Sequence, residues 1–170
     1  MKPQVQPILV LSLILLILGL NSCSSTKEPL SSETWAQMEN VVNSKNFRFD
    51  ALLAEPIGGS RVSRIDLTGY NAFMKFQGDD LQMELPYFGQ RQVAQMGGGS
   101  QGIRFEGTAT DVRTARNEKN NHYNLDFRVR SQSESFQCNL RVYSGMRSVL
   151  TVNSNQRNSI RYEGQIKPLD

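Results

Sequence analysis

The side chains that most often carry out catalysis are scarce in this chain of 170 residues. His122 is its only histidine and follows Asn120 and Asn121, so we expect it to be solvated. A Ser-His-Asp triad needs a base oriented by a third group and a nucleophile in a defined turn, and the chain has no Gly-x-Ser-x-Gly elbow. A zinc site needs three or four clustered ligands. We therefore predict neither a histidine-based hydrolase centre nor a zinc site.

The sequence patterns around Cys138 and around the acidic residues also indicate structural roles. Cys138 alternates with Phe136 and Leu140, which predicts a small buried hydrophobic residue rather than a nucleophile. Asp79 and Asp80 supply two carboxylates beside a turn, fewer ligands than a calcium cage needs. Four acids on the predicted polar faces are expected to form cross-strand ion pairs with Lys75, Arg104, Arg128 and Arg161; they are Glu84, Glu106, Asp126 and Glu163. We predict no catalytic residue, metal or cofactor.

The N-terminus carries a clear chemical signal. Lys2 precedes an apolar run, Ile8 to Leu20, that is shorter than the roughly 20 residues of a membrane span but typical of a signal peptide. The run leads into Leu20-Asn21-Ser22-Cys23, which resembles a bacterial lipobox. In that motif the cysteine sulfur receives a diacylglycerol and cleavage occurs just before the cysteine. We predict a signal peptide over residues 1–22 and lipidation of Cys23; the alternative is an ordinary signal peptide with a chance cysteine.

Lipidation would make the membrane the first partner of this protein. Each buried methylene contributes roughly 0.8 kcal/mol, and two or more acyl chains, palmitate among them, anchor a protein stably. Polar residues 24–32 with a proline then predict a flexible tether, so that residues 23–32 link the lipid to a domain over residues 33–170.

Charge and cysteine content narrow the classes of function. Cleavage removes Lys2, which leaves 18 of the 19 lysines and arginines against 16 acids, a balance near +2 with the charges interspersed. That pattern is not a nucleic-acid footprint. The mature chain of 148 residues suits one domain with its own core. With Cys23 lipidated, Cys138 has no partner for an internal disulfide.

Hydrophobic periodicity predicts one helix followed by strands. Ser31 or Ser32 can cap a helix ending near Ser44, with an apolar stripe formed by Trp35, Met38, Val41 and Val42. From Phe47 onward the period is two residues, which indicates antiparallel strands with one face on a core. The alternating segments are 47–53, 70–76, 81–85, 103–106, 123–130, 136–142, 150–152 and 160–166.

Short turns separate these segments. Gln77-Gly78-Asp79-Asp80 predicts a two-residue hairpin, because Gly78 tolerates the positive φ that such turns require. Such spacing joins neighbouring strands up and down. We expect a mainly β fold: an antiparallel sheet of about eight or nine strands curled into a small barrel or sandwich, with one short N-terminal helix.

Two aromatic residues are the candidate binding surface. Tyr87 and Phe88 follow Pro86, at the end of a strand and before the glycine-rich segment 95–102. They either fold back over the open end of the sheet as a plug or form a binding platform. A second glycine-containing loop spans residues 56–60, and an apolar ligand would enter a barrel between these two loops.

The order of these features resembles a known family. The lipobox, the Gly78 hairpin, Leu85-Pro86-Tyr87-Phe88-Gly89 and the segment from Arg157 to Gly164 are similar to the Bacteroides-type lipoproteins classed as domain of unknown function 4251. The resemblance covers most of the chain from about Trp35 to Ile166. It implies a lipoprotein of the Gram-negative envelope with a β-rich fold and supplies no catalytic residue.

We therefore expect a non-enzymatic envelope lipoprotein with a binding or structural role, for either a small apolar ligand or an envelope protein. A protein-interaction scaffold tethered to an envelope complex is the alternative, and an envelope hydrolase is the weakest one. Ser24 follows the cysteine, where an aspartate would suggest inner-membrane retention, so we expect the outer membrane. Only Glu28 is acidic near Cys23, which favours the periplasmic face.

Overall fold

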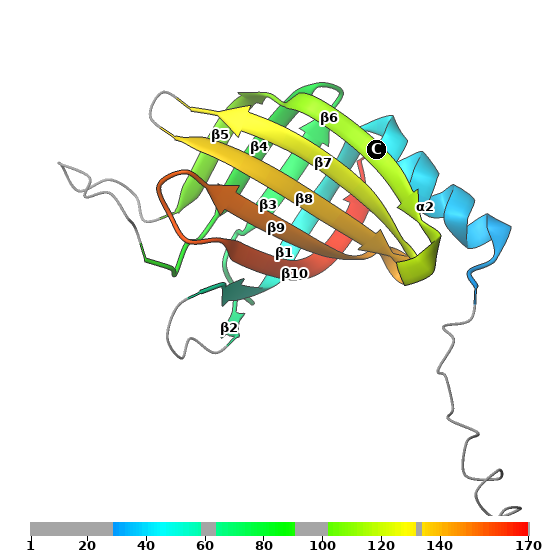
Figure 1. Cartoon of the computed structure of the whole chain (residues 1–170), viewed down its shortest axis with the longest axis horizontal. Helices are drawn as coiled ribbons and strands as arrows, with labels where there is room; N and C mark the ends of the chain where they lie inside the picture. Colours follow the sequence, from blue (N-terminus) through cyan, green and yellow to red (C-terminus); the bar gives the residue numbers. More distant parts are fainter. Residues whose placement is uncertain (1–28, 59–63, 91–101, 132–133, 170) are drawn as a thin grey trace, which may run out of the picture.

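The computed structural model describes residues 29–58, 64–90, 102–131 and 134–169 (Figure 1). The predicted signal peptide, Cys23 and most of the predicted tether lie outside the described residues, as do most of segment 95–102 and residues 59 and 60 of the other glycine-containing loop. Within the described residues, no helix is long and apolar enough to cross a membrane.

One α-helix and ten strands make up the described fold. They are α2 (Ser32–Ser44), β1 (Asn46–Pro56), β2 (Ile65–Asp66), β3 (Phe73–Gln77), β4 (Asp80–Leu85), β5 (Ile103–Thr108), β6 (Thr110–Asn117), β7 (His122–Arg130), β8 (Ser135–Tyr143), β9 (Arg147–Ser154) and β10 (Ile160–Pro168). Two single 3-10 turns, η1 (Glu118–Asn120) and η2 (Ser144–Met146), lie between strands. The mainly β prediction is confirmed.

The helix forms where the apolar stripe predicts it. The hydroxyl of Ser31 accepts a hydrogen bond from the Thr34 backbone N–H at 3.2 Å, which caps the first turn. Lys45 ends the helix in a left-handed conformation, φ 48°. Trp35, Met38 and Val42 are buried, so the stripe packs on the sheet and is not exposed.

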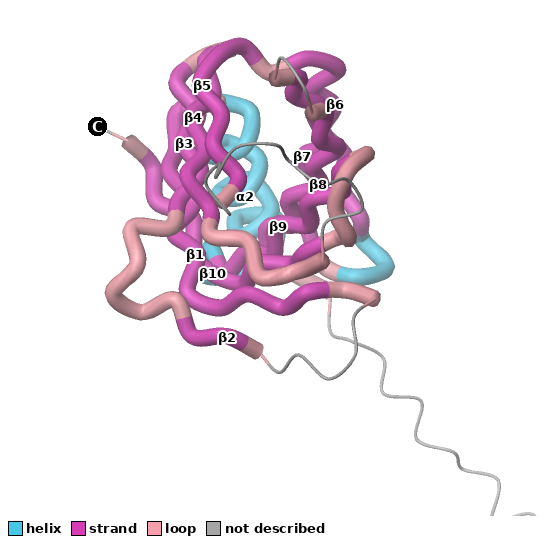
Figure 2. The backbone as a smooth tube through the Cα atoms, turned by 90° about the vertical axis from the view of Figure 1, so that its left-hand side faces the viewer, coloured by secondary structure: helices cyan, strands magenta, loops and turns pink. Residues whose placement is uncertain are grey.

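The sheet is antiparallel throughout, and its shape follows from its strand order, β5-β4-β3-β1-β10-β9-β8-β7-β6. Strand β2 lies off this path and pairs with β1. The two edge strands, β5 and β6, are consecutive in the chain and separated only by Ala109. Because one residue spans so little distance, the edges must meet there, and the sheet must curl into a half-barrel. Figure 2 shows the two limbs of the curl, β3 to β5 and β6 to β8, with α2 between them.

Side chains fill the interior of the half-barrel. Phe47 on β1 packs on Phe76 on β3 with ring centroids 5.4 Å apart, and Phe76 meets Phe127 on β7 edge to face at 5.1 Å. All three are buried, and the last contact joins the two limbs directly. The cavity that an apolar ligand would need inside a barrel is therefore occupied by the core, and we do not retain that version of the binding hypothesis.

A β-bulge interrupts the pairing of β1 with β10. The register shifts between Ala51, opposite Gly164, and Leu53, opposite Glu163, so Leu52 is the extra residue. The strands approach closely here: a Cβ on Gly164 would overlap the carbonyl oxygen of Asp50. The bulge leaves the side chain of Leu52 46% exposed on the surface.

Three local features differ from the sequence expectations. Strand β6 is absent from the alternating segments because its residues are mostly exposed, as suits an edge strand. Strand β2 lies outside the predicted segments and has only two residues. Tyr70 was expected to continue the inward alternation of β3, but that strand begins at Phe73 and Tyr70 is 56% exposed in the preceding turn.

Candidate functional site

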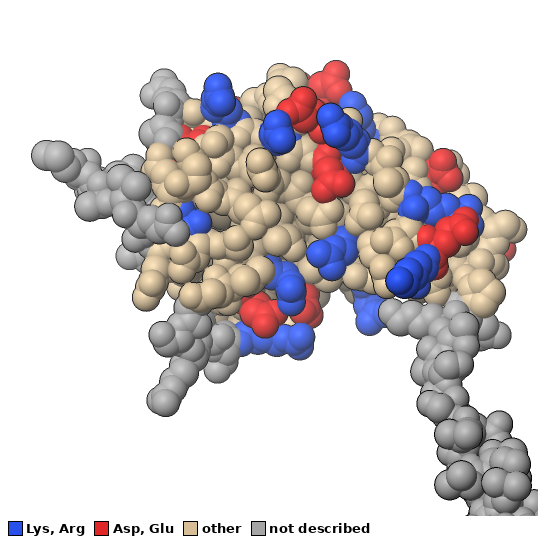
Figure 3. Space-filling model, viewed as in Figure 1, with Lys and Arg blue, Asp and Glu red and all other residues tan. Residues whose placement is uncertain are grey.

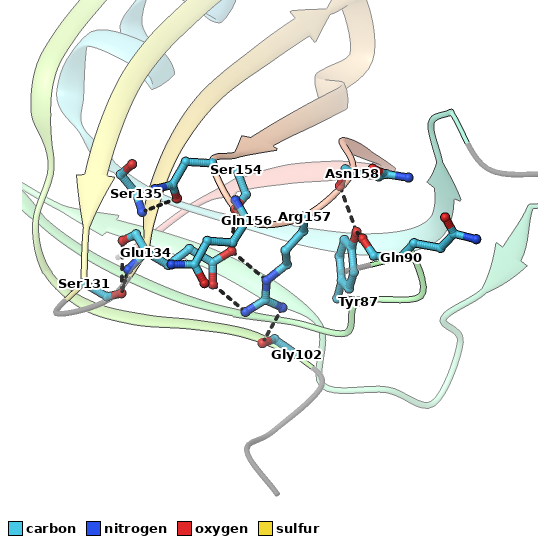
Figure 4. A network of polar contacts seen from close by, with 11 residues as sticks. Tyr87, Gln90, Gly102, Ser131, Glu134, Ser135, Ser154, Gln156, Arg157 and Asn158 are labelled. Atoms are coloured by element: carbon cyan, nitrogen blue, oxygen red, sulfur yellow. Dashed lines mark hydrogen bonds and ion pairs between the residues drawn. The ribbon is translucent and has the colours of Figure 1, made fainter. Parts of the chain in front are cut away.

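The segments around Tyr87 converge at one end of the half-barrel. Strand β4 ends two residues before Tyr87. Strands β5 and β8 begin directly after Gly102 and Glu134, and β10 begins three residues after Arg157. Figure 4 shows these residues pointing toward one another from different segments of the chain. Both limbs of the curl and the β9–β10 connection therefore meet at this point.

A buried ion pair lies at the centre of this network. Nε of Arg157 donates to Oε1 of Glu134 at 2.7 Å, and Nη2 donates to Oε2 at 2.7 Å. The two side chains are only 6% and 7% exposed. The hydroxyl of Ser154 also donates to Glu134 (Figure 4). Such a bidentate, hydrogen-bonded geometry offsets the desolvation cost that two buried charges carry.

Arg157 also connects the limbs. Its Nη1 donates to the carbonyl oxygen of Gly102 at 3.2 Å, next to the start of β5. Its guanidinium carbon lies 5.1 Å from the ring centroid of Tyr87 and 5.9 Å from that of Phe136. One side chain thus links β4, β5 and β8 at the end of the sheet where the limbs are not paired as strands.

Tyr87, one of the two residues of the predicted binding surface, packs into this network. Its ring is buried, and its hydroxyl lies 2.9 Å from the carbonyl oxygens of both Gln90 and Asn158, between which it shares one proton. Gly89 lies against the same ring, where a Cβ would come within 2.7 Å of Cζ. Phe88, the other predicted surface residue, is partly buried, and its ring meets Tyr70 edge to face at 6.5 Å. Its role in binding stays a prediction.

Beside Phe88 lies a surface hollow of about 250 Å³, which we call the aromatic hollow. It is lined by Tyr70, Asn71, Glu84, Leu85, Pro86, Gly102 and Arg104. Two of its polar groups form an ion pair at the surface: Arg104 Nη2 lies 3.2 Å from Glu84 Oε1, in the cross-strand register that pairs β4 with β5. The Asn71 side-chain oxygen accepts a hydrogen bond from Arg48 at 3.0 Å.

A second depression lies on the outer face over the bulge, and we call it the outer groove. It measures about 420 Å³ and is lined by Leu52, Leu53, Tyr143, Arg147, Ser148, Val149, Glu163, Gly164 and Gln165. The bulge turns both leucines toward this face, which gives the groove an apolar wall beside a cation and an anion. On the face seen in Figure 3, most acidic side chains lie next to basic ones, and neither sign forms a continuous field.

The expectation for His122 was wrong and that for Cys138 is confirmed. His122 is buried rather than solvated, because it is the first residue of β7, opposite Tyr143, and the two ring centroids lie 5.3 Å apart. Its Nδ1 lies 3.4 Å from the carbonyl oxygen of Asn120. Cys138 is buried in the core, and burial raises the pKa of its thiol far above the usual value, so it is unsuited to act as a nucleophile.

The predicted ion pairs of the polar face form only in part. Glu84 pairs with Arg104 as expected. Glu163 pairs with Arg64 instead, at 3.2 Å. The other two expected arginines use different acids: Arg128 pairs with Asp111 at 3.0 Å, and Arg161 with Glu55 at 3.3 Å. Among the described residues, no group of three or more His, Cys, Asp or Glu side chains is placed to hold a metal ion.

Sequence reasoning missed the Arg157–Glu134 pair, although a signal for it exists. Glu134 immediately precedes β8 and Arg157 lies just before β10. In an up-and-down sheet both starts fall at the same end, on either side of β9. Two opposite charges at the same end of the sheet are candidates for an ion pair. They are 23 residues apart in the sequence, however, so no local pattern indicates the contact.

The comparisons with known proteins agree on a family and a fold. The model of the family described as domain of unknown function DUF4251 matches residues 30–166. The crystal structure of a DUF4251 family protein from Bacteroides eggerthii DSM 20697 is similar, with a TM-score of 0.60 and 18% sequence identity over 81% of this chain and 89% of that one. No curated protein matches the chain.

Proposed function

The chain belongs to the DUF4251 family, and from that premise we propose that it is a lipid-anchored protein of the Gram-negative envelope with a non-enzymatic role in binding at its outer surface. The family supplies no activity, so the proposal depends on the residues of this chain. The observation that carries it is the packed interior: the core leaves the outer surface as the place where a ligand can bind.

The sequence supports the envelope location. A signal-peptide pattern ends in Leu20-Asn21-Ser22-Cys23, and acylation of Cys23 would hold the domain on a membrane without a spanning helix. Ser24 after the cysteine favours the outer membrane, and the lack of an acidic cluster favours its periplasmic face.

The two surface depressions support a binding role. The aromatic hollow combines the exposed ring of Tyr70 with a carboxylate, a guanidinium and an amide, which is the mixture that small-molecule sites use to orient a ligand. Part of its wall belongs to the paired strands β4 and β5 and to Pro86, whose carbonyl oxygen accepts a hydrogen bond, while Tyr70 and Asn71 come from the connection before β3. We assign the main binding role to this hollow.

The buried histidine and cysteine weigh against an envelope hydrolase. Hydrolysis by a serine or cysteine requires a base within hydrogen-bond reach of a nucleophile that a substrate can approach. His122 is buried against the ring of Tyr143, and Cys138 is buried in the core. The Glu134 carboxylate is engaged by Arg157, so it is not placed to act as a free general acid or base.

A protein-interaction scaffold is a second candidate, and the bulge on β1 favours it. The bulge exposes Leu52 beside Leu53, Tyr143 and Val149 in the outer groove. Exposed apolar surface rimmed by charged residues is typical of surfaces that bind other proteins. In this version the anchored domain would present the groove to a larger envelope assembly.

Crosslinking in intact cells tests the proposed role. A photoreactive phenylalanine analogue replaces Tyr70 in the aromatic hollow, Leu52 in the outer groove, or Arg113 on β6 as an exposed control. Adducts specific to position 70 support surface binding at the hollow. Protein adducts specific to position 52 favour the scaffold. If positions 70 and 52 give no more adducts than the control position, the proposed binding role is wrong.

A further inference from the structure

We propose that the aromatic hollow binds a neutral saccharide, with one sugar ring stacked on Tyr70 and its hydroxyl groups held by Glu84, Arg104 and Asn71. This inference rests on the proposed role in surface binding and adds the chemical class of the ligand.

The exposed ring supplies the stacking surface. Tyr70 is 56% exposed, and its backbone N–H donates to the carbonyl oxygen of Leu67 at 2.8 Å, which fixes the turn that carries it. Phe88 meets it edge to face at 6.5 Å with an interplanar angle of 87° and supports it from one side. Aromatic rings bury large apolar areas at little conformational cost, and the C–H face of a sugar ring is an apolar surface of matching shape.

The polar groups beside the ring match the hydroxyl groups of a sugar. Glu84 can accept hydrogen bonds, and Arg104 can donate them in a fixed planar geometry. The side-chain oxygen of Asn71 is occupied by Arg48, and its amide nitrogen has no partner among the described residues, so it is left to donate. Adjacent sugar hydroxyls both donate and accept, so they can satisfy this set.

The charges of the hollow favour an uncharged ligand. Oε1 of Glu84 and Nη2 of Arg104 lie 3.2 Å apart, so their opposite charges offset each other. A phosphate or carboxylate drawn to Arg104 would lie beside the Glu84 carboxylate, and a cation drawn to Glu84 would meet the guanidinium. Each arrangement places like charges close together, which opposes binding. A neutral polyol encounters neither repulsion.

The hollow is small, and part of its lining is tied to buried side chains. Its volume of about 250 Å³ lies below the roughly 300 to 1,000 Å³ of sites for drug-sized ligands, which suits one ring or the end of a chain. The carbonyl oxygen of Pro86 accepts a hydrogen bond from the Tyr162 hydroxyl at 2.7 Å, and that of Gly102 accepts from Arg157. Two backbone groups that line the hollow are thus held by buried side chains.

The experiment measures binding to the full mature protein in lipid nanodiscs by saturation-transfer NMR. The probes are maltose, cellobiose, mannobiose and galactobiose as neutral sugars, glucose 6-phosphate as an anionic one and glucosamine as a cationic one. Tyr70→Ala removes the stacking face, Tyr70→Phe keeps it, and Arg113→Ala changes an exposed side chain on β6 as the control.

We expect at least one neutral disaccharide to bind, with its affinity reduced about tenfold or more by Tyr70→Ala but by less than twofold in the other two variants. The double variant Glu84→Gln, Arg104→Gln should also bind that disaccharide more weakly than the wild type. Absence of transfer to every neutral probe, stronger binding of a charged probe, or equal effects of Tyr70→Ala and Arg113→Ala would overturn the inference. If no neutral sugar binds but crosslinking at position 70 in cells succeeds, the ligand class is wrong and the binding role stands. If both experiments fail, the binding role itself is wrong.

Discussion

At the scale of single residues, the most consequential feature is a charge pair that has no local signature. Arg157 and Glu134 lie in turns and are separated by two strands, yet they meet in a buried, bidentate contact. Their pairing depends on the strand order, so residue types alone could not reveal it. The same applies to His122, whose polar neighbours indicated exposure, while its place at the start of β7 buries it.

We predict that Arg157→Met strongly destabilises the fold. The change leaves the buried Glu134 without its main partner, which typically costs about 3 to 5 kcal/mol of unfolding free energy. Arg128→Met removes an exposed ion pair with Asp111 and should cost no more than about 1 kcal/mol. Urea unfolding followed by circular dichroism compares the two. Equal, small losses would show that the buried pair does not hold the sheet together.

Asp50 gives a prediction about acid stability. Burial alone would raise the pKa of its carboxyl, but hydrogen bonds from Arg48 at 2.6 Å and Lys167 at 3.0 Å, together with their charges, outweigh burial and lower the pKa below 3.8. A lowered folded-state pKa means that the stabilisation is present above about pH 4 and is lost as the pH falls through the folded-state value. Asp50→Asn should therefore reduce stability at pH 7 and flatten its decline below pH 4.

The measurement for Asp50 is urea unfolding at several pH values between 7 and 2.5. Asp126→Asn on β7, where the exposed carboxylate accepts from Asn139, is the matched control. Parallel stability curves for the wild type and Asp50→Asn would contradict the assigned pKa direction.

At the scale of elements, the two-residue alternation located the strands whose one face is buried, and the capped apolar stripe located α2. Strand β6 was not predicted from the sequence because both of its faces are largely exposed, so its residues do not alternate between apolar and polar. The bulge at Leu52 was not predicted for another reason. Its cause lies on the partner strand, where Gly164 lets the β1 backbone approach.

Gly164→Ala tests this account of the bulge. The added Cβ would overlap the carbonyl oxygen of Asp50 and lie 3.0 Å from Cα of Ala51, so the strands would have to separate. We expect a loss of about 1 to 3 kcal/mol in unfolding free energy, as in other overpacked sites. Gln165→Ala, at the next and exposed position, should change stability by less than about 0.5 kcal/mol. An equal effect of both changes, measured by urea unfolding, would argue against close approach at the bulge.

At the scale of the whole molecule, the sequence predicted a curled antiparallel sheet but not how it closes. Closure depends on β5 and β6 being opposite edges joined by a single residue, and on Phe76 meeting Phe127 across the core. It also depends on the Arg157 network at one end. These are long-range contacts, which a periodicity cannot specify. They fill the interior, which is why the proposed binding role is assigned to the outer surface.

Attachment to a membrane is the central claim for the whole protein, and the two cysteines provide a matched test. Cells expressing the wild type, Cys23→Ser or Cys138→Ser are fed an alkyne analogue of palmitate, and labelled protein is followed through membrane fractionation. We predict label and membrane recovery for the wild type and Cys138→Ser, and neither for Cys23→Ser. Label retained in Cys23→Ser, or unlabelled wild-type protein in the soluble fraction, would contradict the account.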